Sequence, residues 1–202
     1  MNDEKKSSWE RLYSSGAVES LPWFYPGLDP DFEQALESWG ISGGQALDLC
    51  TGPGTQALAL AQRVYRVTAT DISGSAVEKA SRLAREKGLE IAFQQNDIMD
   101  NRLERVFDFV IDRGCYHVFP LEQRAKYVPA VADLLKNGGL LLLKCFSNRE
   151  KRSDGPYRIS PGEIKKLFSS LFQIESIKHT VFQSGDGGRE PKALFCVLRK
   201  RR

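Results

Sequence analysis

The sequence predicts an α/β protein with a mostly parallel sheet in a single domain, and three observations support this class. Short apolar segments alternate with segments of helical periodicity along the chain. The 202 residues suffice for one well-buried domain, and the content of 41% hydrophobic and 27% charged residues is ordinary for a globular protein. The last two predicted strands have no helix between them, so one of them must run antiparallel to its neighbours.

Seven segments are predicted to be strands, of which the fifth is nearly all leucine and typical of a strand buried on both faces. They comprise residues 46–49, 67–71, 89–93, 106–112, 140–144, 174–182 and 193–199. Residues 137–139 predict a turn before the fifth strand, and residues 184–191 predict a flexible hairpin connection between the last two. Helices that connect the parallel strands are expected on both faces of the sheet.

Helical segments are predicted between the strands. They comprise residues 55–62, a helix from Ser75 to Gly88, residues 121–135 and a helix that follows Ser160. Ser75 with Glu78, and Ser160 with Glu163, have the spacing of a capping box, in which two side chains satisfy free backbone N–H groups at a helix start. These two serines are therefore the expected N-caps.

The first 40 residues differ in composition from the rest of the chain. Residues 1–8 are polar and are expected to be frayed. Residues 9–40 combine many aromatic side chains with turn residues, which predicts a segment that packs onto the domain and covers a ligand. The predicted organisation is thus a lid segment at 1–40 and a main domain at 41–202.

Charge, cysteine and hydropathy patterns exclude several classes. The formal net charge of +3 demands no polyanionic partner. The four cysteines lack C-x-x-C spacing, and with two histidines they indicate no metal site, so reduced buried thiols are favoured over disulfides or zinc. No apolar run approaches the ~18 residues of a membrane span, and the N-terminus has no secretory signal, so the cytoplasm is the expected location.

Polar residues at the carboxyl ends of the predicted strands mark the expected ligand site, because ligands of open α/β sheets bind there. In strand order, these ends carry Asp48 with Gly52 and Gly54, Asp71 with Ile72, Asp97 with Ile98, and Asp112. Glycines let the backbone approach a ligand closely. A carboxylate beside the glycine loop disfavours a pyrophosphate and favours a cationic ligand.

Each acid has a physical role to play toward a nucleoside ligand. Asp71 can accept hydrogen bonds from both ribose hydroxyls, and Asp97 can accept one from an adenine amino group. Ile98 supplies apolar area and a backbone N–H. Asp48 and Asp112 are expected near the cationic end of the ligand. The alternative for each single acid is a helix N-cap or a solvated loop carboxylate.

These residues resemble the class I S-adenosylmethionine-dependent methyltransferases, over roughly residues 40–200. The resemblance implies a Rossmann-like sheet of seven strands with the last one antiparallel, and S-adenosyl-L-methionine as the cofactor. It places Asp48, Gly52 and Gly54 on the methionine-side loop, Asp71 on the ribose and Asp97 with Ile98 on the adenine. Cys50 stands where the family usually has the first glycine of the loop.

The N-terminal segment carries a second resemblance. The sequence from Trp9 to Tyr13, followed by Leu-Pro-Trp23, is similar to the branch that methylates small molecules (thiopurines, thiols, halides and tellurite). In that branch aromatic residues of this segment close over the donor, which implies that role for Trp9, Tyr13 and Trp23. The alternative is that these aromatics simply pack on the sheet. The expected acceptor is a small molecule with a soft nucleophile such as a thiol.

Acceptor-side candidates follow the fourth strand. They are Asp112, Tyr116 and His117. A general base is needed for a neutral hydroxyl or amine and is optional for a soft anion. His117 as that base is one hypothesis, and a histidine that packs beneath the site is the favoured alternative. Cys115 lacks the context of a covalent nucleophile, and covalent catalysis is not expected.

Three other functions stay open at this point. Gly52, Gly54 and Ala57 fit the G-x-G-x-x-A dinucleotide pattern, so an NAD(P)-binding oxidoreductase is one alternative. A nucleic acid or protein acceptor is a second, since residues 199–202 are basic, although a solvated tail is the favoured reading. A non-catalytic module that binds S-adenosylmethionine is a third. The oligomeric state and the acceptor's identity are not determined by the sequence.

Overall fold

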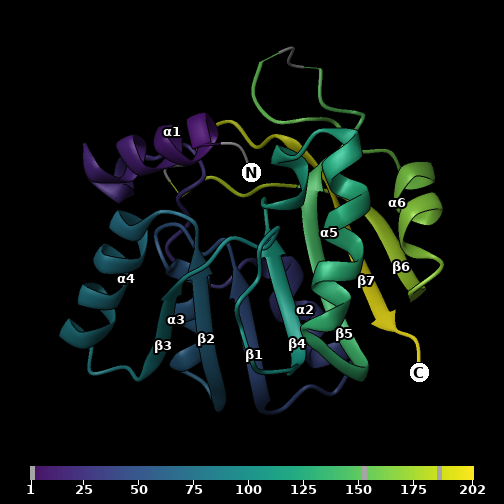
Figure 1. Ribbon diagram of the computed structural model, residues 1–202, viewed down its shortest axis with the longest axis horizontal. Coiled ribbons are helices and arrows are strands. Elements are labelled where there is room, and N and C mark those ends of the chain that lie inside the picture. Colours follow the sequence, from purple (N-terminus) through teal and green to yellow (C-terminus); the bar gives the residue numbers. More distant parts are fainter. Residues whose placement is uncertain (1–2, 152–153, 186–187) are drawn as a thin grey trace.

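The computed structural model describes residues 3–151, 154–185 and 188–202 (Figure 1). Its strands are β1 (Gly44–Leu49), β2 (Tyr65–Asp71), β3 (Ile91–Gln95), β4 (Phe107–Arg113), β5 (Leu135–Phe146), β6 (Phe172–Val181) and β7 (Lys192–Lys200). They form one sheet in the order β3-β2-β1-β4-β5-β7-β6. Strands β1 to β5 pair in parallel, and β7 is antiparallel to both of its neighbours. The predicted fold is confirmed. Residues 186–187 of the predicted hairpin connection lie outside the described residues.

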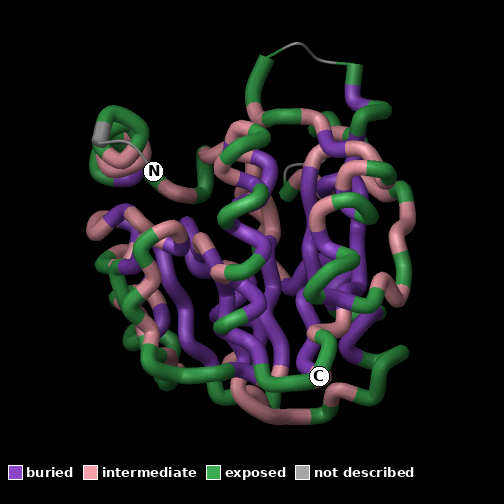
Figure 2. Tube along the Cα trace, turned by 45° about the vertical axis from the view of Figure 1, so that its right-hand side comes forward, coloured by how far each residue is buried: buried purple, intermediate pink, exposed green. Residues whose placement is uncertain are grey.

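Helices cover both faces of this sheet. They are α1 (Asp3–Ser14), α2 (Pro30–Ser38), α3 (Thr55–Ala61), α4 (Gly74–Glu86), α5 (Leu121–Asp133) and α6 (Pro161–Phe168), with 3-10 turns at Val18–Ser20 and Tyr116–Val118. Successive strand residues point to opposite faces. Leu47 and Leu49 therefore join one apolar core with α5 and α6, whereas Ala46 joins another with α2 and α3. Figure 2 shows the buried strands between the partly exposed helices. None of the helices in the described residues is long and apolar enough to cross a membrane.

Three local predictions are wrong. The N-cap of α4 is Ser73, whose hydroxyl accepts from Ala76 N at 3.1 Å, because the helix already begins at Gly74 and Ser75 lies in its first turn. Strand β5 begins at Leu135 instead of residue 140, and a register shift against β4 absorbs the glycines at 138–139. Residues 3–8 form the start of α1, which packs on α4, and residues 1–2 lie outside the described residues. The predicted cap of α6 is confirmed, since Ser160 accepts from Glu163 N.

The cysteines correct another prediction. Cys145 and Cys196 are buried and free, as expected, but Cys50 and Cys115 form a disulfide with a Cα–Cα distance of 5.7 Å. The bond is possible because β1 and β4 are neighbours, and Leu49 pairs with Asp112. The residues that follow these two strand ends are therefore adjacent in space, although 65 positions separate them in sequence.

Candidate active site

A cavity of about 270 Å³ lies beyond the carboxyl ends of the parallel strands. Its wall on the β1–β3 side includes Asp48, Gly52, Asp71, Ile72, Asp97 and Ile98. The N-terminal segment contributes Trp9, Tyr13 and Trp23. The wall on the β4–β5 side includes Arg113, His117, Phe119, Phe146, Phe182 and Arg189. The structure thus brings ten of the predicted site residues into one cavity.

The glycine loop is held closed by Asp48. Its Oδ2 accepts from Thr51 Oγ1 at 2.5 Å and from the backbone N–H of Ala57 in α3 at 3.0 Å. Burial of the carboxyl raises its pKa to about 7, against the lowering effect of these two hydrogen bonds. Gly52 adopts a φ of +50° at the apex of the loop, a conformation that favours glycine. Asp48 therefore shapes the loop as well as facing the cavity.

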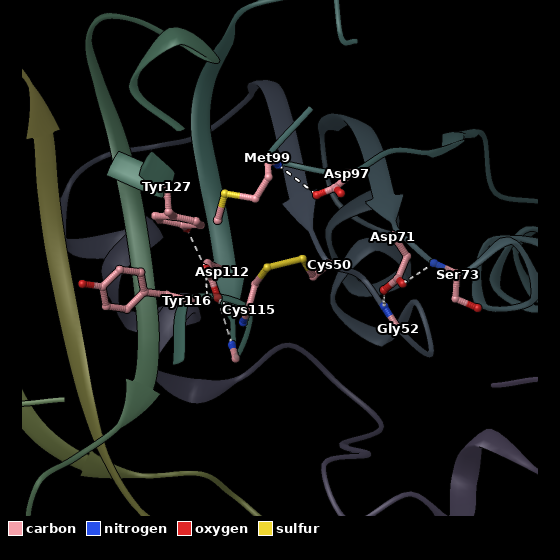
Figure 3. The surroundings of a disulfide bond; sticks show 11 residues. Cys50, Gly52, Asp71, Ser73, Asp97, Met99, Asp112, Cys115, Tyr116 and Tyr127 are labelled. Carbon is pink, nitrogen blue, oxygen red and sulfur yellow. Dashed lines mark hydrogen bonds between the residues drawn. A yellow bond between two sulfur atoms is a disulfide. The ribbon is translucent and has the colours of Figure 1, made fainter. Parts of the chain in front are cut away.

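Asp71 is anchored from both sides at the end of β2 (Figure 3). Its Oδ2 accepts from Gly52 N at 2.9 Å and its Oδ1 from Ser73 N at 2.9 Å. Burial raises its pKa to about 6. The two backbone bonds fix the carboxylate at the cavity wall with lone pairs left for two further donors.

Asp97 lies on the same wall and contacts the N-terminal helix. Its Oδ1 accepts from Met99 N at 2.9 Å, and its Oδ2 lies 3.1 Å from Lys6 Nζ of α1. Ile98 is 3% exposed and packs in the core beside β1. A carboxylate and an apolar side chain thus adjoin at the end of β3, as the sequence predicts for an adenine site.

Three aromatic rings roof the donor side of the cavity. The Trp9 and Trp23 ring centroids are 5.9 Å apart, and Trp23 Nε1 donates to Tyr13 Oη at 3.3 Å. A Cβ placed on Gly52 would lie 2.5 Å from Tyr13 Oη, so the ring covers this glycine directly. Burial, followed by the charge of Asp71, raises the pKa of Tyr13 and keeps its hydroxyl neutral.

His117 lies on the opposite wall with both faces packed. Its ring centroid is 4.7 Å from that of Phe146 and 5.8 Å from that of Phe182. Nδ1 accepts from the backbone N–H of Phe146 at 2.8 Å. Burial, followed by the positive charges of Arg158, Arg113 and Arg124, lowers the pKa of His117 to about 3. The ring is therefore neutral, with its proton on Nε2.

Three predicted site residues lie outside the cavity wall. Asp112 is fully buried and accepts from three backbone N–H groups and from the Tyr127 hydroxyl at 2.6 Å. Tyr116 is also fully buried, with its ring 5.1 Å from that of Tyr127. Both residues fold the segment after β4 and are not acceptor-side groups. Gly54 packs on α4, where an added Cβ would lie 2.7 Å from Ala80 Cβ.

A buried charge network at the ends of β4 and β5 is absent from the sequence predictions. Lys144 Nζ lies 2.6 Å from Asp29 Oδ1 and 2.7 Å from Asp31 Oδ2, and its side chain has no exposed area. Arg113 donates to Asp29 Oδ2 at 2.8 Å and to the Trp23 carbonyl at 2.9 Å. The position of a lysine within a leucine strand could have revealed this network, because a buried cation requires a partner of opposite charge.

Comparisons with known proteins agree with this site. Residues 46–139 match the family model described as a methyltransferase domain. The chain is 26% identical over 196 residues to 2-heptyl-1-hydroxyquinolin-4(1H)-one methyltransferase of Mycobacteroides abscessus, covering 93% of this chain and 86% of that one. It is 26% identical to probable thiol methyltransferase 2 of Arabidopsis thaliana, covering 88% and 78%. A solved structure from work on the conversion of a disulfide bond into a thioacetal group during echinomycin biosynthesis shares the fold, with a TM-score of 0.83 at 24% identity, covering 97% and 93%.

The sheet order and these similarities together indicate an enzyme class that uses S-adenosylmethionine. The findings support a class I S-adenosylmethionine-dependent methyltransferase that is similar to the small-molecule branch of this class. Its cofactor is S-adenosyl-L-methionine, and its substrate is a small molecule. Nothing in these comparisons supports the oxidoreductase alternative.

Proposed function

We propose that the protein transfers a methyl group to the sulfur of a small, largely apolar thiol that binds as the thiolate. The observation that carries the proposal is the contrast between the two walls of the cavity. The donor wall holds Asp48, Asp71 and Asp97, whereas the opposite wall holds arginines and aromatic rings. A sulfonium is favoured beside the carboxylates, and an anion is favoured beside the arginines.

The wall opposite the donor wall, which we call the acceptor wall, contains no general base among the described residues. His117 Nδ1 is occupied by the Phe146 N–H, so Nε2 carries the hydrogen and can donate but not accept. Asp112 is saturated by four donors and lies outside the cavity. A neutral hydroxyl or amine would need a base in the transition state, whereas a thiolate does not. This supports a thiol acceptor.

The positive potential at this wall promotes the thiolate. Arg113, which lines the cavity and lowers the pKa of His117, would also lower the pKa of a thiol bound beside it, although its ion pair with Asp29 reduces this effect. Phe119, Phe146 and Phe182 supply apolar area for the body of the acceptor. His117 Nε2–H is a hydrogen-bond donor in position to orient the nucleophile.

Residues 1–40 act as a lid over the donor in this proposal. Trp9, Tyr13 and Trp23 contribute the aromatic roof, and a ring face near a sulfonium adds about 0.5–2 kcal/mol of cation–π attraction. Glu10 accepts from the Ser73 hydroxyl at 2.7 Å and so attaches α1 to α4. Arg113 attaches Trp23 on the acceptor side through its carbonyl.

The site residues then have these roles. Asp71 accepts from the ribose hydroxyls, Asp97 and Ile98 bind the adenine, and Asp48 with Gly52 binds the methionine portion. The bound cofactor supplies an electrophilic methyl group on a sulfonium. The protein aligns the thiolate with that methyl group and excludes water, and such alignment supplies on the order of 7–11 kcal/mol in favourable systems.

The test is a matched pair of acceptors that differ in one atom. Thiophenol and phenol have similar shape, and S-adenosylhomocysteine formation measures turnover with each. We expect kcat/KM for thiophenol to exceed that for phenol by at least about 100-fold, which is about 2.7 kcal/mol of barrier difference. Equal rates would reject the thiol assignment, and no product with any thiol, amine or phenol would indicate a non-catalytic binding module.

The lid is tested separately by Trp23→Ala, with Trp39→Ala as the matched control. Trp39 is partly exposed and stacks on Arg199 away from the cavity. We expect Trp23→Ala to weaken S-adenosylmethionine binding about tenfold and Trp39→Ala to leave it unchanged. Unchanged binding in both variants would reject the lid.

A further inference from the structure

The Cys50–Cys115 disulfide forms part of the wall of the donor cavity (Figure 3). It lies between the Asp71–Gly52 group on one side and the Asp112–Tyr116 group on the other. Cys50 precedes the glycine loop, at a φ of +56°, and Cys115 begins the 3-10 turn after β4. The bond therefore joins the loop assigned to the donor to the strand end that begins the acceptor wall.

We propose that this disulfide is a thiol-reactive site, and that small thiols entering the cavity are the compounds that react with it. The proposal rests on the proposed function in one respect, namely that a thiol acceptor enters this cavity. Both cysteines line the cavity, so a bound thiol reaches the bond without unfolding of the chain. The two other cysteines, Cys145 and Cys196, have no exposed area and lie outside the cavity wall.

The two sulfurs differ in access. Cys50 is half-buried, whereas Cys115 is 3% exposed and packs in the apolar core with Leu49 and Ile98. An incoming thiolate therefore attacks Cys50 Sγ, and Cys115 is the leaving group. The buried, apolar surroundings of Cys115 favour its protonated thiol over the thiolate once it is released.

The reaction balances with two equivalents of thiol. The first thiolate forms a bond to Cys50 Sγ as the Cys50–Cys115 bond breaks, and Cys115 takes up a proton. A second thiol attacks the external sulfur of this mixed disulfide, which releases a symmetrical disulfide and leaves Cys50 as a thiol. Two thiols are oxidised by two electrons in total, and the protein disulfide is reduced to two thiols.

Because the Cys50–Cys115 disulfide lies in the wall assigned to the donor, its reduction is expected to affect donor binding. A cofactor product in the cavity covers the wall that contains Cys50, so S-adenosylhomocysteine is expected to protect the bond. Reduction also removes the covalent link between residue 50 and the end of β4. The loop at 50–54 then keeps its bonds to Asp48 and Asp71 and the backbone bond from Thr51 N to the Thr70 carbonyl, but no covalent link to β4. We therefore expect donor binding to be several-fold weaker in the reduced protein.

The experiment measures alkylation of each cysteine by peptide mass spectrometry on the native protein. 2-Mercaptoethanol is the thiol, iodoacetamide is the label, and Cys145 and Cys196 are internal controls. Without thiol we expect no label at any cysteine. After thiol treatment we expect label at Cys50 and Cys115 only, and at least a tenfold slower reaction with saturating S-adenosylhomocysteine. Label without thiol, label only in denaturant, or an unchanged rate with S-adenosylhomocysteine would each overturn the proposal.

A single-cysteine variant tests the assignment of the attacked sulfur. In Cys115→Ser the Cys50 thiol is free, and incubation with oxidised 2-mercaptoethanol should form a mixed disulfide at Cys50. Cys50→Ser is the matched control, and we expect its Cys115 to react at least tenfold more slowly. Faster reaction at Cys115 would overturn the assignment. Neither assay needs a methyl donor. If thiol–disulfide exchange occurs as expected but no thiol is methylated, only the proposed function is rejected.

Discussion

The Nδ1 atom of His117 accepts a hydrogen bond from the backbone N–H of Phe146 at 2.8 Å. This bond fixes the tautomer of a buried imidazole that lies on the acceptor wall. A general base at this position would need a free Nε2 lone pair, and the tautomer removes it. Four predictions on the site and one on the fold follow from such specific contacts.

His117 should act as a hydrogen-bond donor with no titration of its own near neutral pH. We expect His117→Gln to lower kcat/KM for a thiol about tenfold and to leave the pH profile unchanged in shape. His179→Gln is the control, because His179 is exposed and lies away from the cavity wall. A wild-type profile with an inflection near pH 6.5 that disappears in His117→Gln would show that the base hypothesis is correct.

The same histidine affects stability in acid. Its pKa falls from 6.5 in the unfolded chain to about 3 in the fold, so the native state binds fewer protons between these values. The free energy of unfolding is therefore fully retained above about pH 6.5 and decreases as the pH falls toward 3. Urea titrations of wild type and His117→Gln at several pH values measure this. Identical slopes against pH would contradict the assignment of a neutral buried imidazole.

Asp71→Asn should separate binding from folding. Loss of the carboxylate is expected to weaken S-adenosylhomocysteine binding by about 10- to 100-fold, since charge-assisted bonds contribute about 1.5–3 kcal/mol. The pKa of Asp71 is raised to about 6, so its ionisation destabilises the apo fold as the pH rises from 4 through 6. The variant lacks this ionisation but accepts only one of the two backbone N–H bonds, so its stability should vary less than that of wild type between pH 4 and pH 8. Calorimetric titration and thermal unfolding measure both effects, with exposed Asp133→Asn as control.

The charge of the sulfonium should produce a pH-dependent preference. Asp48 and Asp71 have pKa values of about 7 and about 6, so both become anionic as the pH rises through this range. S-adenosylmethionine carries a positive sulfur and S-adenosylhomocysteine does not. We divide the Kd for S-adenosylhomocysteine by the Kd for S-adenosylmethionine. This ratio is expected to rise about tenfold from about pH 5.5 to about pH 8. A constant ratio would show that these carboxylates do not face the sulfur.

Gly54 and Gly88 form a matched pair for the fold. Both have positive φ, +80° and +67°, but an added Cβ at Gly54 meets Ala80 Cβ at 2.7 Å and one at Gly88 meets open space. Gly88→Ala should cost about 1 kcal/mol from the backbone alone, and Gly54→Ala about 2–4 kcal/mol because α4 must also shift. Denaturant unfolding measures both. Equal losses would mean that contact with α4 does not restrict residue 54.

The sequence predicted the elements whose signal is local. The strands at 46–49 and 67–71 are short segments separated by a segment of helical periodicity, and this alternation predicts a parallel sheet. Local capping was less secure, since both Ser73 and Ser75 fit a helix start and the helix begins one residue before Ser75, at Gly74. Both hydroxyls also donate to Glu10 of α1, a contact between distant positions that a local pattern could not reveal.

Predictions about pairing and side-chain direction were weaker for the same reason. Asp112 follows a strand just as Asp71 does, but its carboxylate turns inward to cap three N–H groups. The disulfide of Cys50 required knowledge that β1 and β4 are neighbours in the sheet. Lys144 was expected at a strand end, but its partners Asp29 and Asp31 belong to a segment whose position the sequence left open.

Arg113 connects two segments of the cavity wall. Its guanidinium bonds to the Trp23 carbonyl and to the Gln183 carbonyl, at 2.9 and 3.3 Å. One side chain thus ties the roof near the N-terminus to the connection that leaves β6. A substitution that shifts this connection is therefore expected to shift Trp23 on the cavity wall as well, so residues near position 183 can change the shape of the cavity from both sides.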